Sequence, residues 1–94
     1  MAIQGLTTHA RMRMQQRGIP SDAVEDLRDY GCVEHDHRGS EIVYFDKPAR
    51  RRLAREHGGQ LDERLARLTR AYAVLTAGGS VRTIGWRYKR IQRN

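Results

Sequence analysis

Cysteine is nearly absent from this sequence of 94 residues, in which Cys32 is the only one. A lone cysteine excludes an internal disulfide, and it excludes a zinc site built within one chain from cysteine ligands alone. Long apolar runs are missing as well. None approaches the ~20 residues that a membrane-spanning helix needs, and the N-terminus lacks the apolar core of a signal peptide. We therefore expect a cytoplasmic protein that does not associate with membranes.

Large apolar residues are also scarce. Leu, Ile, Val and Phe together account for 18 of the 94 residues, and the formal net charge is +7. Chains with so few apolar residues and so high a net charge lie close to the boundary with disorder. The apolar residues nevertheless recur in periodic blocks separated by turn residues, which predicts a folded chain. The length supports one domain over residues 1–94, with a thin core.

Positive charge is abundant, and it is segregated along the chain. Residues 1–17 carry a net charge of +3, residues 18–46 a net charge of −6, and residues 47–94 a net charge of +10. Sixteen of the 18 basic residues are arginine, whose planar guanidinium suits bidentate contacts with phosphate. A basic surface that is kept apart from an acidic one predicts a polyanionic partner, most simply a nucleic acid.

Hydrophobic periodicity and turn residues predict an α+β domain, in which two helices precede an antiparallel sheet. Helices are expected near residues 8–17, 22–30, 46–57 and 61–68. Strands are expected at residues 32–35, 41–45, 72–76 and 81–88, and Gly78 and Gly79 turn the last two strands into a hairpin. Thr7 or Thr8 is predicted to cap the first helix, and Ser21 or Asp22 the second.

The N-terminal part of the chain resembles a known family. Residues 9–19 read HARMRMQQRGI, which fits the motif HAxxRMxxRGI. An acid-rich second helix follows, and the last strand is of the Gly-Val-Arg-Thr-Ile type. In these features residues 7–46 and 70–91 resemble the DUF4258 family, which is grouped with the RelE-like toxins among the metal-independent endoribonucleases.

The resemblance implies both a fold and an activity. The expected fold has two N-terminal helices packed on a curled antiparallel sheet of about four strands. The implied protein is a toxin-like endoribonuclease that cleaves RNA by acid–base catalysis, without a metal ion or other cofactor. RNA, with or without the ribosome, is the implied substrate, and an antitoxin protein that covers the basic face is an implied partner.

Residues 47–69 depart from that family, which links these strands more briefly, and they form an expected Arg-rich helical insertion. Asp46 is predicted to cap its helix, whose first turn tolerates Pro48. The arginines of this helix are candidates for contact with RNA or the ribosome, although such a run is also typical of a solvated helix face. They are Arg50, Arg51, Arg52 and Arg55.

Cleavage of RNA without a metal requires a base for the 2′-hydroxyl, an acid for the leaving 5′-oxygen and cations around the phosphate. On the first helix, His9, Arg13 and Arg17 recur one turn apart and provide a proton carrier beside two cations. We expect His9 and Tyr88 to converge on one phosphate, with Arg13 and Arg87 on either side of it. Further candidates are Lys89 and Arg90 at the end of the last strand, and Thr83 on the same strand as a hydroxyl donor.

Structural interpretations of these residues remain open. His9 could cap neighbouring backbone or bond a carboxylate, and Arg13 and Arg17 could pair with acids of the second helix. On the last strand, Trp86 and Tyr88 share a face with Ile84, where they could pack in the core. A tryptophan there could also stack on a nucleobase.

Cys32, His35 and His37 are spaced like a group of metal ligands, but alternation along a strand places Cys32 opposite His35. The two histidines alone fall short of the four ligands of a structural zinc site, so we expect no metal site.

Three functions are consistent with these observations. The first is the metal-independent endoribonuclease. The second is a non-catalytic basic module that binds RNA, DNA or the ribosome. The third is an interaction domain whose acidic segment, residues 18–46, docks a basic partner.

Overall fold

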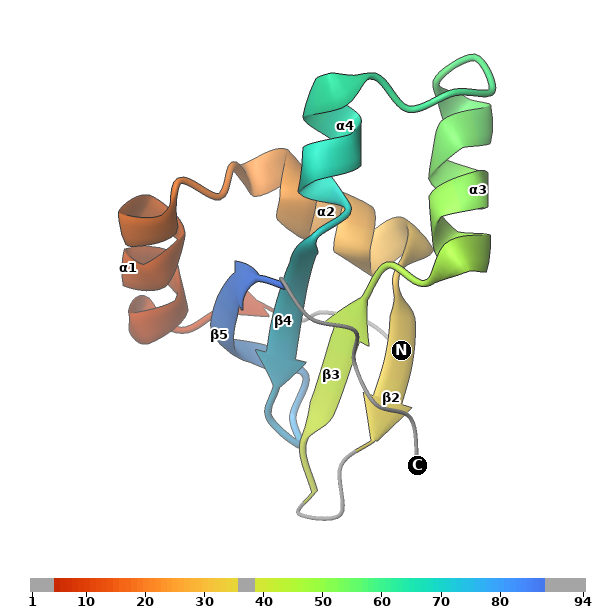
Figure 1. The fold of residues 1–94 in the computed structure, drawn as a ribbon. Coiled ribbons are helices and arrows are strands. Elements are labelled where there is room, and N and C mark those ends of the chain that lie inside the picture. The colour runs from red at the N-terminus through yellow and green to blue at the C-terminus, as the bar shows by residue number, and fades with distance from the viewer. Residues whose placement is uncertain (1–4, 36–38, 88–94) are drawn as a thin grey trace.

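The computed structural model describes residues 5–35 and 39–87 (Figure 1). The four predicted helices are all present, and each begins and ends within about two residues of its predicted position. The elements follow one another in the order β1 (Gly5–Leu6), α1 (Thr8–Arg17), α2 (Ser21–Tyr30), β2 (Cys32–His35), β3 (Glu41–Tyr44), α3 (Lys47–Glu56), α4 (Glu63–Leu68), β4 (Ala71–Leu75) and β5 (Ser80–Trp86).

The strands form one sheet in the order β1-β5-β4-β3-β2. The α+β class is confirmed, but the expected antiparallel sheet of about four strands needs correction. The sheet has five strands and is mixed, because β1 pairs parallel to β5 through Gly5 with Ser80 and Leu6 with Val81. Two residues are too few to produce a recognisable period in a sequence, so β1 could not be predicted.

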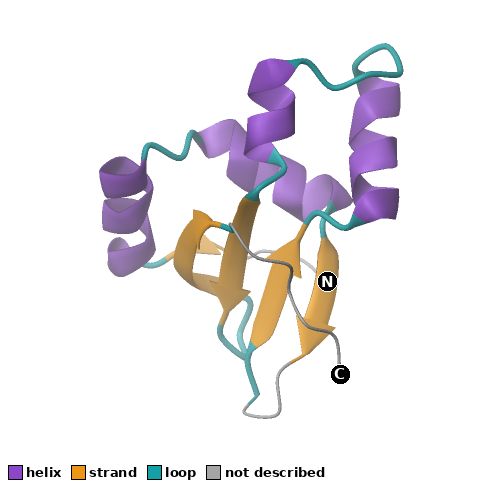
Figure 2. Ribbon diagram, in the orientation of Figure 1, coloured by secondary structure: helices purple, strands orange, loops and turns teal. Residues whose placement is uncertain are grey.

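The helices gather around one face of the sheet. In Figure 2, α2 passes behind the strands and no described helix lies in front of them. Helix α1 packs on β5, α2 packs on β4, and α3 packs on α2. The strands alternate accordingly: along β4, Ala71, Ala73 and Leu75 are buried in the core with Leu27 of α2, whereas Tyr72 and Val74 are half-buried.

Three of the four described helices begin with a side-chain N-cap. Thr7 caps α1 by accepting a hydrogen bond from the Ala10 amide at 3.1 Å, and Gly18 ends it in the left-handed conformation, with φ at 64°. Asp46 caps α3 as predicted. The prediction that Ser21 or Asp22 caps α2 is wrong, since Pro20 occupies the N-cap and provides no side-chain hydrogen bond.

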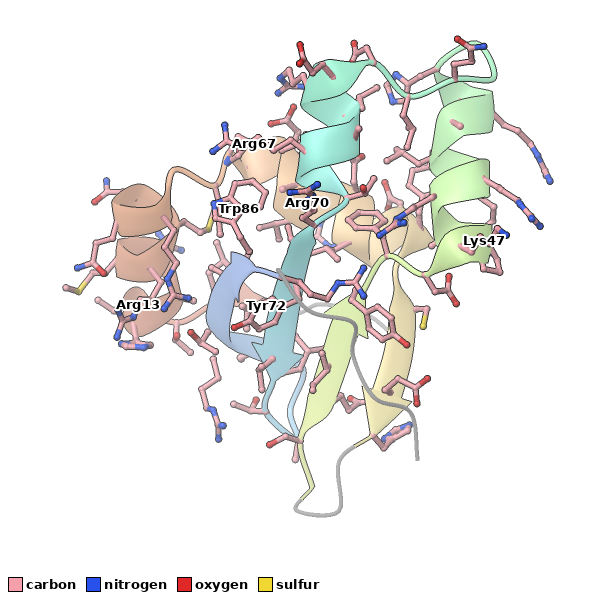
Figure 3. The ribbon with its side chains drawn as sticks, viewed as in Figure 1. Arg13, Lys47, Arg67, Arg70, Tyr72 and Trp86 are labelled. Atoms are coloured by element: carbon pink, nitrogen blue, oxygen red, sulfur yellow. The ribbon has the colours of Figure 1, made fainter. Side chains whose placement is uncertain are left out.

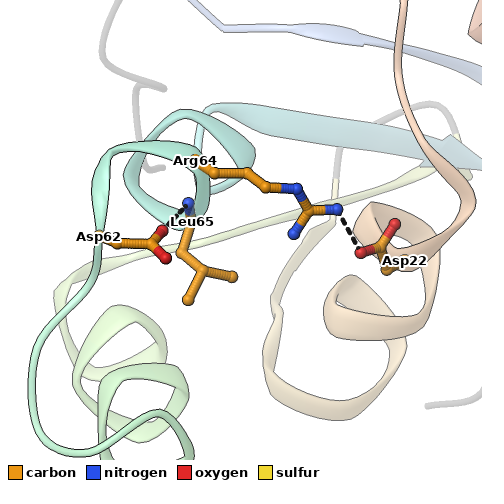
Figure 4. Close-up of polar contacts among 4 residues, drawn as sticks. All are labelled: Asp22, Asp62, Arg64 and Leu65. Atoms are coloured by element: carbon orange, nitrogen blue, oxygen red, sulfur yellow. Dashed lines mark hydrogen bonds and ion pairs between the residues drawn. The ribbon is translucent and has the colours of Figure 1, made fainter.

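The Asp22 carboxylate is used for a different contact (Figure 4). It accepts a hydrogen bond from Nη2 of Arg64 at 2.6 Å, which ties α2 to α4. Asp62 caps α4 by accepting from the Leu65 amide at 2.8 Å. The hydrogen bond from Arg64 is the main reason that the pKa of Asp22 lies below its usual value. A hydrogen bond from the backbone amide of Asp22 lowers it further, and the positive charge of Arg64 adds a smaller effect.

Residues 47–69 are part of the core. Helices α3 and α4 contribute the buried side chains of Ala49, Leu53, Leu65 and Leu68 to the same cluster that α2 and the sheet form. The Arg-rich segment therefore has an apolar side that stabilises the fold and a charged side that remains available for binding. No described helix is both long and apolar enough to cross a membrane.

Candidate functional site

One face of the sheet carries no helix in the part of the chain that the structure describes, and we call it the helix-free face. Tyr44, Tyr72 and Gly85 form a row across three of its strands, because Tyr44 pairs with Tyr72 and Tyr72 pairs with Gly85. Adjacent strands lie about 4.8 Å apart, so side chains in one row are within reach of one another. Figure 3 shows Tyr72 on the side of β4 that faces the viewer. Alternation along the strands adds Glu34 and Thr83 to this face, and Arg87, which directly follows β5, reaches it through its contact with Tyr44.

Arg17 reaches this row from the last turn of α1. Its Nη1 donates a hydrogen bond to the carbonyl oxygen of Ile84 at 2.6 Å. A Cβ atom placed on Gly85 would lie 2.7 Å from that nitrogen and 3.1 Å from the hydroxyl oxygen of Tyr72. The absence of a side chain at Gly85 thus makes room for a guanidinium and a phenol side by side.

The backbone of Arg17 is attached to the same strand. The indole Nε1 of Trp86 donates a hydrogen bond to the carbonyl oxygen of Arg17 at 2.7 Å. Trp86 is partly buried against the core, in agreement with the packing interpretation of this residue. No ion pair joins Arg13 or Arg17 to the acids of α2 in residues 5–35 and 39–87, so the structural alternative for these two arginines is wrong.

Arg87 extends from β5 toward β3. Its Nη2 donates a hydrogen bond to the carbonyl oxygen of Phe45 at 3.0 Å, and its guanidinium lies over the ring of Tyr44, 5.2 Å from the centroid. Burial lowers the pKa of this guanidinium, and the nearby positive charge of Arg50 lowers it further. The guanidiniums of Arg87 and Arg50 therefore lie close enough to interact, and two neighbouring positive charges attract an anion.

Tyr44 connects Arg87 to an acid. Its hydroxyl donates a hydrogen bond to Glu34 Oε1 at 3.3 Å. The helix-free face therefore has two groups beside Tyr72: Arg17 over Gly85 on one side, and Arg87 with Tyr44 and Glu34 on the other.

His9 and Arg13 form a separate pair on α1. Arg13 Nε lies 3.5 Å from His9 Nε2, at the outer limit of a hydrogen bond, and its Nη1 donates to Gln16 Oε1 at 3.3 Å. His9 is exposed and contacts no carboxylate among the described residues, so neither interpretation of it as a backbone cap or a carboxylate partner is confirmed. No hydrogen bond links this pair to the helix-free face within the described ranges.

Some of the remaining predicted residues lie within the described ranges and others lie outside them. Thr83 lies on the helix-free face, where it pairs with Val74. Tyr88, Lys89 and Arg90 lie outside the described residues, as does His37, so the convergence of His9 and Tyr88 stays a prediction.

The arginines of α3 do not form a uniform set. All four are exposed, but Arg52 Nη2 donates a hydrogen bond to the carbonyl oxygen of Tyr30 at 3.0 Å and so joins α3 to the end of α2. The guanidiniums of Arg50, Arg51 and Arg55 form no hydrogen bond or ion pair with any described residue. The three free guanidiniums are available to a partner, whereas Arg52 has a structural contact.

The two described candidates for metal ligands, Cys32 and His35, do not lie together. Cys32 pairs with Tyr44 and His35 with Glu41, at opposite ends of β2, and Nδ1 of His35 lies 3.6 Å from the Glu41 carboxylate. No three His, Cys, Asp or Glu residues in the described part of the chain are grouped so that they could hold a metal ion.

A pocket of about 440 Å³ lies on the other side of the end of β5. The turn between α1 and α2 forms one wall at Gly18 and Pro20, and α4 forms the opposite wall. Trp86 lies between them, with the guanidinium of Arg67 over its ring, 5.0 Å from the centroid (Figure 3). We call this cavity the Trp86 pocket.

Sequence reasoning missed the central member of the site, Tyr72, and the glycine opposite it. Alternation shows that Gly85 and Thr83 share a face, but it does not show which residue of a neighbouring strand lies beside them. The register between β4 and β5 includes an irregularity at Val74 and Leu75, so counting back from the hairpin turn does not give the correct partners.

No family model matches this chain, and no curated protein or solved structure is significantly similar to it. The contacts of the chain itself must therefore support any proposal about its function.

Proposed function

We propose that the helix-free face binds the phosphate backbone of RNA and that the protein cleaves it there as a toxin-like endoribonuclease, without a metal ion. The observation that carries this proposal is the position of the Tyr72 hydroxyl beside the guanidinium of Arg17. Arg87 lies over Tyr44, the cross-strand neighbour of Tyr72. A phenol with a cation on either side combines a proton-transfer group with groups that stabilise a charged phosphate.

Both guanidiniums are held in place before a ligand binds. Arg17 donates to the carbonyl oxygen of Ile84, and Arg87 donates to that of Phe45. A guanidinium has five N–H donors, so each retains donors for the oxygens of a phosphate. Because the carbonyl bonds fix the direction of these donors, little reorganisation is needed as negative charge develops in the transition state.

The proposed reaction is a transfer of the phosphoryl group within the RNA. The 2′-oxygen loses its proton and attacks phosphorus, and the bond to the 5′-oxygen breaks as that oxygen gains a proton. The products carry a 2′,3′-cyclic phosphate and a 5′-hydroxyl. We assign the proton transfer to the leaving oxygen to Tyr72, and His9 and Tyr88 remain our candidates for the base.

A non-catalytic module that binds RNA, DNA or the ribosome is the second candidate. The observation that favours it is the charged side of α3, where Arg50, Arg51 and Arg55 are exposed. Their guanidiniums form no hydrogen bond or ion pair with a described residue. Such a surface binds a polyanion without any chemistry. An antitoxin with an acidic segment would bind the same surface.

Mapping of RNA ends distinguishes the two candidates. RNA incubated with the purified protein, with and without ribosomes and EDTA, is expected to acquire discrete 5′-hydroxyl ends that EDTA does not abolish. Tyr72→Phe removes only the hydroxyl and should lower the cleavage rate about 100-fold or more, with RNA affinity unchanged. Tyr30→Phe on α2 is the matched control and should cleave like the wild type. RNA binding without any cleavage would overturn the nuclease and support the binding module.

A further inference from the structure

We propose that the Trp86 pocket binds a nucleobase of the RNA strand whose phosphates lie on the helix-free face, an inference that rests on the proposed function. Trp86 provides a fixed aromatic surface for such a base. Its indole Nε1 donates to the carbonyl oxygen of Arg17 at 2.7 Å, and its apolar side packs against the core, so the ring cannot rotate freely. An aromatic ring that is fixed before binding stacks a base at a low cost in entropy.

The guanidinium of Arg67 shows that a planar group fits over this ring. It lies over the ring, 5.0 Å from the centroid, on the face of the indole that a stacked base would cover. Arg67 is exposed, and its guanidinium forms no hydrogen bond or ion pair with any residue in the described ranges. It can therefore move from the ring to the phosphate of the entering nucleotide, where a charge-assisted contact replaces the contact with the indole.

The size and charge of the pocket fit a nucleotide. Its volume of about 440 Å³ is sufficient for a nucleobase with its ribose, since small-molecule sites usually measure about 300–1,000 Å³. Arg64 in the wall is already paired with Asp22, which leaves Arg67 as the cation for a phosphate. Glu63 also lines the pocket, and its carboxylate can accept hydrogen bonds from N–H groups of a base.

Arg17 connects the pocket to the helix-free face. Its carbonyl oxygen holds Trp86 on one side of β5, and its guanidinium lies over Gly85 on the other side. Gly85 and Trp86 are consecutive residues of a strand, so they point to opposite faces. An RNA strand that crosses the end of β5 would thus place a phosphate on Arg17 and a neighbouring base against Trp86.

The fluorescence of the protein tests this proposal directly, because Trp86 is the only tryptophan in the chain. The purified protein is titrated with 5′-GMP, with guanosine and with ribose 5-phosphate at constant ionic strength. GMP and guanosine should change the fluorescence in a saturable way, and ribose 5-phosphate should not. Arg67→Gln should weaken GMP about tenfold, by the loss of one charged contact, and should not weaken guanosine. Arg28→Gln, an exposed guanidinium on α2, is the control and should bind GMP like the wild type.

An equal response to GMP and ribose 5-phosphate would overturn the proposal, because the site would then recognise phosphate alone. The absence of a saturable response to GMP would also overturn it. The titration does not depend on cleavage, so the two proposals fail separately. A saturable response to GMP in a protein that does not cleave RNA would refute the nuclease and support the pocket, and cleavage without that response would refute the pocket.

Discussion

Arg17 and Ile84 are joined by a hydrogen bond of 2.6 Å from the guanidinium Nη1 to the carbonyl oxygen, although 67 positions separate them in the chain. This bond directs a cation of α1 onto the sheet and away from the acids of α2. The neighbouring position on the strand is Gly85, and the combination places the guanidinium beside Tyr72. The candidate site thus depends on one helix end, one strand and one glycine.

Gly85→Ala should move the guanidinium of Arg17 away from Tyr72 and from the carbonyl oxygen of Ile84. A Cβ atom 2.7 Å from Arg17 Nη1 forces the guanidinium to move, and the lost hydrogen bond should lower the free energy of unfolding by about 1 kcal/mol. Urea unfolding measures the change. Gly78→Ala is the matched control, because a Cβ atom there would meet, among the described residues, only Thr76 Oγ1 at 3.9 Å. Its effect should stay within about 0.5 kcal/mol.

The origin of the effect is tested in the Arg17→Ala background. If the clash with the guanidinium is responsible, Gly85→Ala should lower the free energy of unfolding less in the Arg17→Ala protein than in the wild type, as expected for residues in contact. An equal decrease in the free energy of unfolding in both backgrounds would contradict the role of Gly85 in accommodating Arg17.

His9→Ala should lower the cleavage rate about 100-fold if His9 transfers a proton. RNA affinity should remain. The unfolding free energy should change by no more than about 0.5 kcal/mol, because His9 is exposed and its side chain has only the weak hydrogen bond with Arg13 among the described residues. Cleavage kinetics on a labelled RNA and thermal unfolding measure the two effects. His35→Ala, an exposed histidine on β2, should cleave at the wild-type rate. Equal rates in both variants would assign the base to another residue.

The arginines of α3 should separate into binding and structural roles. Replacement of Arg50, Arg51 and Arg55 by Gln should weaken RNA binding without unfolding the protein, since none of the three has a described partner. If each contacts one phosphate of a single strand, the slope of log affinity against log salt should become less steep by about two units. Filter binding at several salt concentrations measures this slope.

Arg52→Gln should behave differently. It removes the hydrogen bond to the carbonyl oxygen of Tyr30 and should lower the unfolding free energy by about 0.5–1.5 kcal/mol. Its effect on the salt slope should be smaller than a third of that of the triple variant. A salt slope that none of these four replacements alters would show that α3 is only a solvated helix face.

Two acids of α2 should affect stability with opposite signs. The hydrogen bond from Arg64 lowers the pKa of Asp22, so this carboxylate stabilises the fold above its unfolded pKa, near 3.8, and the contribution disappears as the pH falls through the folded pKa. Burial raises the pKa of Asp26, and the charge of Asp22 raises it further. The ionised form of Asp26 therefore destabilises the fold at neutral pH.

Asp22→Asn should accordingly lower stability at pH 7 by a few tenths of a kcal/mol, because the pair with Arg64 is exposed and screened by solvent. Asp26→Asn should raise stability at the same pH. Both differences from the wild type should shrink in acid, below the pKa of an unperturbed Asp. Urea unfolding at pH 7 and in acid measures them, and a change of the same sign in both variants at pH 7 would contradict the assignment.

Much of the fold could be predicted from local sequence. The Thr7 cap and Gly18 define α1, because a capping hydroxyl and a left-handed glycine act within one turn of the chain. The alternation Ala71, Ala73 and Leu75 defines the buried side of β4 for the same reason, since the period of a strand is visible over five residues. The segregation of charge between residues 18–46 and 47–94 is likewise a property of the sequence alone.

The arrangement of the site depended on contacts between distant residues. The sequence indicated that Arg17 is a cation at the end of a helix, but its position on the sheet depends on the carbonyl of Ile84, and Tyr72 joins it only through the register of β4 with β5. In the same way, Arg52 differs from the other arginines of α3 because the packing of α3 on α2 brings the carbonyl oxygen of Tyr30 within its reach. Propensities and caps act over a few residues, whereas the direction of a long side chain is decided by whichever backbone carbonyl the packed fold brings within reach.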